Sequence, residues 1–296
     1  MPKPRSQNFC FLKKSIICIN YILRYNCFAK KDNNIPHRDQ TIDSLRGIAI
    51  IVMILTHVTV FYYSDALARS LWDLSHFSVP IFIFCSVYLF LQKHMANPVR
   101  FIPFVKKRVV RLVIPYYLFL PFFFLTLWFL KPQALTAPYI IDSILLIGGV
   151  DINWLVLLFI FLAILLPLFV WLHHRIKTLF WAGFLLSLTC SLLLLFYTPP
   201  FSYKFIMWLP WSLMLYFTFF FLHYEKNKKK LLLLFCITAS IFAAGYFMKI
   251  ALDKSVILIH NKYPPNLFYL SDGVSILLLL SFILKKLQSP LFLKIS

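Results

Sequence analysis

Long apolar runs recur along the chain from Leu45 onward, and short polar segments that hold most of the charges separate them. Eight of the runs are long enough to cross the roughly 30 Å hydrocarbon core of a bilayer as helices. They cover residues 45–63, 75–92, 112–130, 154–172, 179–197, 205–222, 231–249 and 267–284. The pattern predicts an all-α fold, a polytopic integral membrane helix bundle with about eight transmembrane helices.

Residues 1–42 have a different pattern, because basic side chains interrupt every apolar stretch. The longest uncharged run, from Ser15 to Leu23, is too short to span a bilayer and suits a helix lying at its surface. We therefore expect a basic N-terminal segment, 1–42, that is cytoplasmic or interfacial, followed by a transmembrane domain, 43–296. The apolar stretch from Tyr139 to Val150 is also too short to cross, which favours a re-entrant or interfacial segment.

Composition strengthens the membrane interpretation, because 61% of the 296 residues are hydrophobic and the mean hydropathy is +0.80. A soluble globular domain has an apolar share of about one half. The cysteines show no C-x-x-C pair and no other spacing typical of metal ligands. We therefore expect neither a metal site nor a disulfide framework.

The formal net charge of +20 raises the question of a nucleic-acid partner. The basic residues lie between the apolar runs, however, and a cytoplasmic N-terminus places 24 of the 30 Lys and Arg residues on the inner side. This is the asymmetry of the positive-inside rule. It leaves on the outer side Arg69, Lys131, Lys204, Lys249, Lys254 and Lys262. We therefore expect a multi-pass protein with a cytoplasmic N-terminus, surrounded by lipid and without a nucleic-acid partner.

The first apolar run holds two ionisable side chains, Arg46 and His57. Eleven residues of helix return almost to the starting face and rise about 16 Å, so both side chains lie on one side of the helix. An ionisable group in hydrocarbon is costly to insert and indicates a function. A neutral imidazole can act as a general base near neutral pH. The alternative is structural, with Arg46 as a boundary anchor and His57 as a hydrogen-bonded packing residue.

A basic cluster, K-K-R-V-V-R, precedes the third apolar run and contains Arg108 and Arg111. Residues three apart share a helix face. Two guanidinium groups at the cytoplasmic end of a helix match phosphate oxygens and suit a polyphosphate ligand such as coenzyme A. The alternative is that both arginines only anchor the helix by the positive-inside rule.

Polar residues also gather near the outer ends of three predicted helices. They are Ser75 and His76, then Asp151, Asn153 and Trp154, and finally Asp272. We expect Trp154 to belong to the interfacial aromatic belt and the aspartates to be solvated. The alternative for the aspartates is a contact with glycan hydroxyl groups.

Four blocks of the chain, taken together, resemble the acyltransferase-3 family of bacterial membrane acyltransferases. They are R-D-Q-T-I-D-S-L-R-G-I-A-I-I-V-M-I-L-T-H, F-S-V-P-I-F-I-F-C-S-V-Y-L-F, K-K-R-V-V-R-L-V-I-P-Y-Y and N-W-L-V-L-L-F-I-F-L-A-I-L-L-P. The resemblance extends from about residue 38 to the C-terminus. The family's R-x10-H element corresponds to Arg46 and His57, and its R-x-x-R element to Arg108 and Arg111.

The resemblance implies transfer of an acetyl or other acyl group from cytoplasmic acyl-coenzyme A to a sugar hydroxyl in the bacterial inner membrane. In this hypothesis Arg46 and His57 are catalytic and Arg108 and Arg111 bind the donor, without a metal. His57 acts as a general base or as a transient acyl carrier, and the sequence leaves both routes open. The acceptor is a glycan or a lipid-linked sugar.

Two alternatives remain at this stage. In the first, the protein is a transporter or flippase for a lipid-linked sugar, in which His57 relays protons and the arginines are anchors. In the second, it is a truncated and inactive family member, because the stretch from Leu291 to Ser296 resembles the lead into the family's final membrane helix.

Overall fold

The computed structural model describes residues 39–97 and 99–287. Within them the chain forms α-helices and short 3-10 turns and no β-strand, which confirms the predicted all-α fold. The helices are α2 (Gln40–Thr59), α3 (Ala66–Leu74), α4 (Ser78–His94), α5 (Phe101–Leu130), α6 (Ala137–Ile144), α7 (Asn153–Arg175), α8 (Lys177–Leu193), α9 (Trp208–Trp211), α10 (Leu213–Tyr224), α11 (Lys228–Ala251) and α12 (Leu267–Leu287). The predicted N-terminal segment up to residue 38 and the stretch from Leu291 to Ser296 lie outside the described residues.

Six helical stretches of the described residues are long and apolar enough to cross a membrane, so the chain is a multi-pass membrane protein. They are Gln40–Tyr62, Ala66–His94, Phe101–Leu130, Asn153–Arg175, Lys228–Ala251 and Leu267–Leu287. The two remaining predicted runs form shorter apolar helices, α8 and the pair α9 and α10. Pro210 lies just before the break in that pair, and a proline removes a backbone N–H donor.

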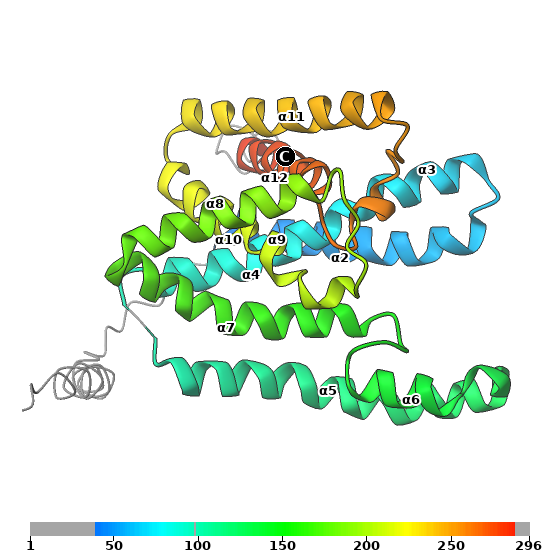
Figure 1. Cartoon of the computed structure of the whole chain (residues 1–296). Helices are drawn as coiled ribbons and strands as arrows, with labels where there is room; N and C mark the ends of the chain where they lie inside the picture. Colours follow the sequence, from blue (N-terminus) through cyan, green and yellow to red (C-terminus); the bar gives the residue numbers. More distant parts are fainter. Residues whose placement is uncertain (1–38, 98, 288–296) are drawn as a thin grey trace, which may run out of the picture. The chain divides into compact units, whose positions relative to one another are not determined.

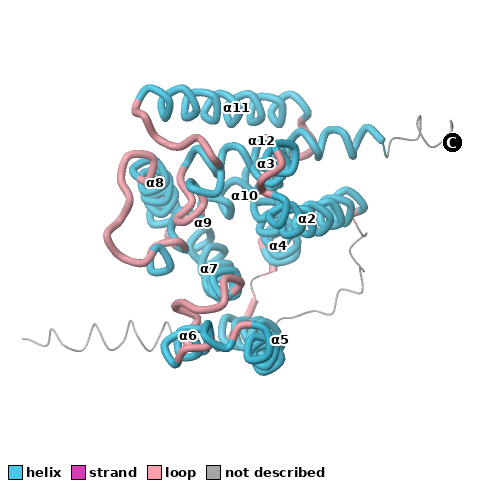
Figure 2. Tube along the Cα trace, turned by 90° about the vertical axis from the view of Figure 1, so that its right-hand side faces the viewer, coloured by secondary structure: helices cyan, strands magenta, loops and turns pink. Residues whose placement is uncertain are grey.

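Helix α4 lies at the centre of the bundle, where α2, α7, α10 and α12 pack against it (Figures 1 and 2). Its side chains Ile81, Ile83 and Val87 have no exposed surface. The outer helices differ, because α5 packs mainly on α7 and α11 mainly on α12, and both expose many Leu, Phe and Ile side chains. In a bilayer these exposed apolar side chains form the surface that lipid covers.

The N-terminus of α2 is fixed by its cap residue, Asp39. The Asp39 carboxylate accepts hydrogen bonds from the backbone N–H groups of Thr41 (2.9 Å) and Ile42 (3.3 Å), which satisfies donors that the first helical turn leaves unpaired. The Tyr88 hydroxyl of α4 lies 3.1 Å from Asp39 and 2.9 Å from Glu225 at the end of α10. This hydroxyl therefore joins three helices at the end of the bundle where α2 begins.

At the opposite end, α12 approaches α4 closely at a glycine. A Cβ atom on Gly273 would collide with the ring of Pro80, so only glycine permits this packing. The predicted short segment from Tyr139 to Val150 also belongs to this end. It forms most of α6 and a turn, and the hydroxyl of Tyr116 on α5 donates a 2.7 Å hydrogen bond to the Ser143 carbonyl. The segment does not span the bundle.

Candidate active site

A cavity of about 240 Å³ brings two of the predicted site residues together. Arg46 reaches it from α2 and Arg108 from α5, and Ser86 of α4 also lines it. Its remaining walls are Phe82, Leu89 and Phe159. The cavity therefore combines two guanidinium groups with apolar walls from α4 and α7.

Arg108 is held in this cavity by two contacts. Its Nη1 atom donates a 3.1 Å hydrogen bond to the Ser86 hydroxyl, and its guanidinium carbon lies 5.2 Å from the centre of the Phe104 ring. The side chain is half-buried, and a guanidinium group has five N–H donors. One hydrogen bond to Ser86 leaves donors for an anionic ligand.

The other two predicted residues lie outside this cavity. Arg111 is exposed on α5, where its charge acts on that of Arg108. His57 is exposed on α2, eleven residues beyond Arg46, which corresponds to a rise of about 16 Å along a helix. The structure therefore brings Arg46 and Arg108 together and places His57 in the other half of α2.

The half of α2 that contains His57 packs against η2 (Ser75–Phe77). Thr56, the residue before His57, forms a 2.7 Å hydrogen bond with Ser75. His76, which follows Ser75, is 2% exposed, and its Nδ1 atom lies 2.7 Å from the Trp72 carbonyl oxygen. His76 interacts electrostatically with both His57 and Lys262. His57 is thus exposed at the edge of a buried polar cluster.

Lys262, the second buried residue of this cluster beside His76, lies in the segment between α11 and α12. It is 8% exposed, and its ammonium lies 4.9 Å from the Trp154 ring centre and 5.0 Å from that of Tyr263. Such contacts stabilise a cation where water is excluded. Burial still lowers the pKa of Lys262 to about 8, although the negative charge of Asp151 acts in the opposite direction.

The comparison with family models decides which family this arrangement belongs to. The model of the acyltransferase domain, acyltransferase-3, matches residues 39–296. This chain belongs to the acyltransferase-3 family. No curated protein and no solved structure matches it. The predicted resemblance is thereby confirmed, and the protein is in general terms a membrane acyltransferase, with an acyl donor and an acceptor as its substrates.

Two expectations for the end of this acyltransferase that contains η2 are wrong. Trp154 is 5% exposed and packs on Lys262 and Tyr263, so it does not lie in a lipid-facing aromatic belt. Asp272 is 7% exposed and is therefore not solvated. For Trp154 the cause is the segment after α11, which supplies Lys262 and Tyr263 and is held to α3 by a 2.8 Å hydrogen bond from the Leu258 backbone N–H to Asp73. Asp272 lies on α12, which packs against α2, α4, α11 and η2.

The sequence reasoning missed Lys262 and Ser86 as neighbours of the predicted acyltransferase site. The sequence predicts only an outer-loop position for Lys262 and no contact for Ser86. A lysine between Asn261 and Tyr263 offers no local pattern that predicts burial, because its partners Trp154 and His76 are distant in sequence. Within residues 39–97 and 99–287, no three His, Cys, Asp or Glu side chains are grouped as metal ligands.

Proposed function

We propose that this acyltransferase transfers an acyl group, most simply acetyl, from cytoplasmic acyl-coenzyme A to a hydroxyl of a cell-surface or lipid-linked glycan. Its location would be the bacterial inner membrane, with the N-terminus in the cytoplasm. The observation that supports this most directly is the cavity in which Arg46 and Arg108 meet from different helices. Two cations facing one space repel each other, and a polyphosphate between them offsets that repulsion.

The donor is held by three arginines in this proposal. Arg108 and Arg46 bind phosphate oxygens or the thioester end inside the cavity, and exposed Arg111 binds phosphate at its mouth. The acyl end of the donor then extends along α2 toward His57. Because Ser86 fixes one edge of the Arg108 guanidinium, the remaining N–H groups are oriented before the donor binds.

His57 provides the acid–base chemistry by one of two routes. In the first, its neutral ring nitrogen takes the proton of the acceptor hydroxyl, the oxygen forms a bond to the thioester carbonyl carbon, and the C–S bond breaks. The proton then passes from the imidazolium to the departing thiolate. In the second route, a ring nitrogen bonds to the thioester carbonyl carbon, the C–S bond breaks, and the thiolate leaves with the ring N–H proton. The acceptor oxygen then bonds to the acyl carbon, the C–N bond breaks, and the hydroxyl proton passes to the imidazole. Both routes consume one thioester and produce one ester and one free thiol.

Radiolabelled acetyl-coenzyme A and purified protein test the donor assignment. We expect the wild-type protein to bind coenzyme A and to transfer label to bacterial glycans. The double variant Arg108→Ala, Arg111→Ala should weaken coenzyme A binding about 10- to 1000-fold, because it removes charge-assisted hydrogen bonds to phosphate. The matched control is Lys106→Ala, Lys107→Ala, which removes two exposed cations of the same helix turn and should change affinity little.

Two outcomes would contradict the proposal. An equal loss in the arginine and lysine variants would mean that only the general positive charge of this end attracts the donor. Transport of a labelled sugar across vesicles, without acylation and without a response to coenzyme A, would indicate a transporter instead.

A further inference from the structure

Asp272 on α12 is a buried carboxylate with incomplete hydrogen bonding. Its side chain is 7% exposed, and within the described residues its Oδ2 atom has no hydrogen-bond partner. A buried polar atom without a partner costs free energy, and such atoms in folded proteins usually meet a ligand or water. The donor cavity between α2, α4, α5 and α7 does not include Asp272, so its role lies elsewhere in the protein.

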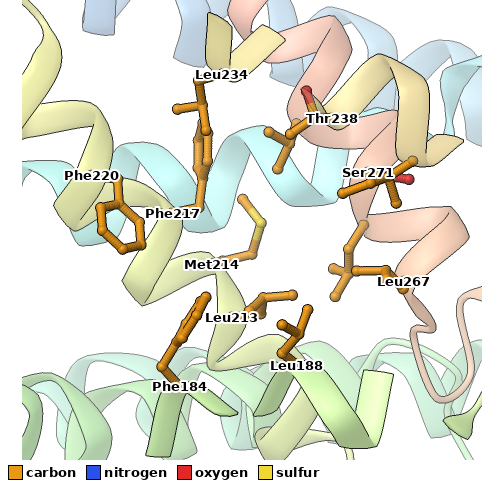
Figure 3. A pocket seen from close by; sticks show the side chains of 13 residues that line it. Phe184, Leu188, Leu213, Met214, Phe217, Phe220, Leu234, Thr238, Leu267 and Ser271 are labelled. Atoms are coloured by element: carbon orange, nitrogen blue, oxygen red, sulfur yellow. The ribbon is translucent and has the colours of Figure 1, made fainter. Parts of the chain in front are cut away.

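The two sides of α12 show where Asp272 points. Leu267, Leu270, Ser271 and Val274 line an apolar pocket of about 180 Å³ between α8, α10, α11 and α12, and Figure 3 shows Leu267 and Ser271 on that side. Tyr269 lies on a different side, because its hydroxyl donates a 2.9 Å hydrogen bond to the His76 carbonyl. Asp272 follows Tyr269 by three residues and so shares its face. The carboxylate is therefore directed toward η2 rather than toward the apolar pocket.

The groups around this face come from four separate parts of the chain. The Tyr269 hydroxyl of α12 donates a hydrogen bond to the His76 carbonyl, and Asp73 of α3 accepts a hydrogen bond from the Leu258 backbone N–H. Lys262 follows η5 (Leu258–Asn261), which packs against α3 and α12, and the half of α2 that contains exposed His57 packs against η2. An unpartnered acceptor atom, a buried ammonium and an exposed imidazole thus come from elements that pack around η2. This combination differs from the donor cavity, where the charged lining residues among those the structure describes are arginines.

We propose that Asp272 and Lys262 form the acceptor-binding side of the active site, where they hold a carbohydrate with free hydroxyl groups against His57. The Asp272 carboxylate accepts a hydrogen bond from one sugar hydroxyl, and the Lys262 ammonium donates one to another sugar oxygen. A hydroxyl beside these two then faces the His57 ring. Both residues position the acceptor and take no proton in the reaction. This inference rests on the proposed function.

The test uses full-length protein, radiolabelled acetyl-coenzyme A and four octyl glycosides: the glucoside, galactoside, mannoside and N-acetylglucosaminide. We expect Asp272→Leu to raise the KM for the accepted glycoside about 10- to 100-fold, which is the effect of losing a hydrogen bond to a charged group. The Kd for coenzyme A should stay within about twofold, because arginines at the other end bind it. Asp272→Asn keeps the shape and a carbonyl oxygen and should restore part of the acceptor affinity.

The control is Ser281→Ala on the same helix. Ser281 is also buried, but its hydroxyl donates a 2.8 Å hydrogen bond to the Leu277 carbonyl and needs no ligand. An unchanged KM in Asp272→Leu would overturn the inference. So would a loss of coenzyme A binding in both Asp272 variants, since it would assign the residue to packing. Absence of transfer by the wild-type protein to all four glycosides would contradict the carbohydrate acceptor itself, and hence the proposed function.

Discussion

The two halves of α2 offer different chemistry although one helix contains both. At the first half, Arg46 meets Arg108 in a cavity whose charged lining residues, among those the structure describes, are these two arginines. At the second half, His57 adjoins η2, where His76 and Lys262 are buried and toward which Asp272 of α12 is directed, so groups of both signs of charge are present. A purely cationic cavity favours a polyanion, whereas a mixed buried cluster suits a neutral ligand with many hydroxyl groups. One helix can thus present a donor and an acceptor to each other.

The strongest test of separate roles for the two halves of α2 is to remove the imidazole of His57. We expect His57→Ala to lower kcat for acyl transfer about 10²- to 10⁴-fold, the range for a lost general acid–base group. Coenzyme A affinity should not change, since Arg46 lies in the other half of α2 and Arg108 lies on α5. Initial rates with labelled acetyl-coenzyme A and equilibrium binding of coenzyme A measure the two effects separately.

The control for this variant is Val58→Ala, which removes an exposed apolar side chain from the adjacent position and should leave kcat nearly unchanged. Undiminished transfer by His57→Ala would remove His57 from the mechanism and reduce the second half of α2 to a structural element.

Measuring KM and Kd against pH also separates the two halves of α2, because arginines lie at the first half and Lys262 lies near the second. Burial lowers the pKa of Lys262 to about 8, whereas an arginine stays protonated up to about pH 12. Above pH 8, Lys262 therefore loses its charge but keeps N–H donors, so its hydrogen bond to the acceptor loses charge assistance and we expect the acceptor KM to rise about 3- to 10-fold. The Kd for coenzyme A should stay level between about pH 7 and 9.

Lys262→Met is the matched variant, since it keeps the apolar stem that packs between Trp154 and Tyr263. It should show the high acceptor KM at every pH. If the variant and the wild-type protein shared one pH profile of KM, Lys262 would have no part in acceptor binding.

The membrane fold was largely predictable because it depends on local hydropathy. Each run from Leu45 onward is apolar enough to define a helix without information about its neighbours. The exceptions are the fifth run, which forms the shorter helix α8, and the sixth, which forms the pair α9 and α10 with a break at Ser212. A window that averages hydropathy does not register where a helix ends or breaks.

The site was predictable only in part, for a related physical reason. Arg46 and His57 stand out because charged groups in apolar runs are costly, and Arg108 stands out because it lies three residues before Arg111 at the start of another run. Their partners do not stand out: Ser86 is an ordinary helix serine until Arg108 reaches it from α5. Asp272 lies near the start of an apolar run, where solvation is the simplest expectation. It is buried because α12 packs against elements that are distant in sequence, among them α2, α4 and η2, and such tertiary contacts leave no periodic pattern.

The Ser86 hydroxyl offers the test with the smallest expected effect, which is on coenzyme A affinity alone. Ser86→Ala removes the hydroxyl that accepts the 3.1 Å hydrogen bond from Arg108, while both arginines keep their charges. A net contribution of about 0.5–1.5 kcal/mol predicts a 2- to 12-fold weaker coenzyme A affinity. The KM for the acceptor should not change, because Ser86 lines the cavity that contains Arg46 and Arg108.

Ser78→Ala, a buried serine at the other end of α4, is the control that should leave coenzyme A affinity intact. A donor affinity equal to wild type in Ser86→Ala would mean that Arg108 is positioned by the Phe104 ring alone, whereas a parallel change in acceptor KM would mean that the two halves of α2 do not act separately.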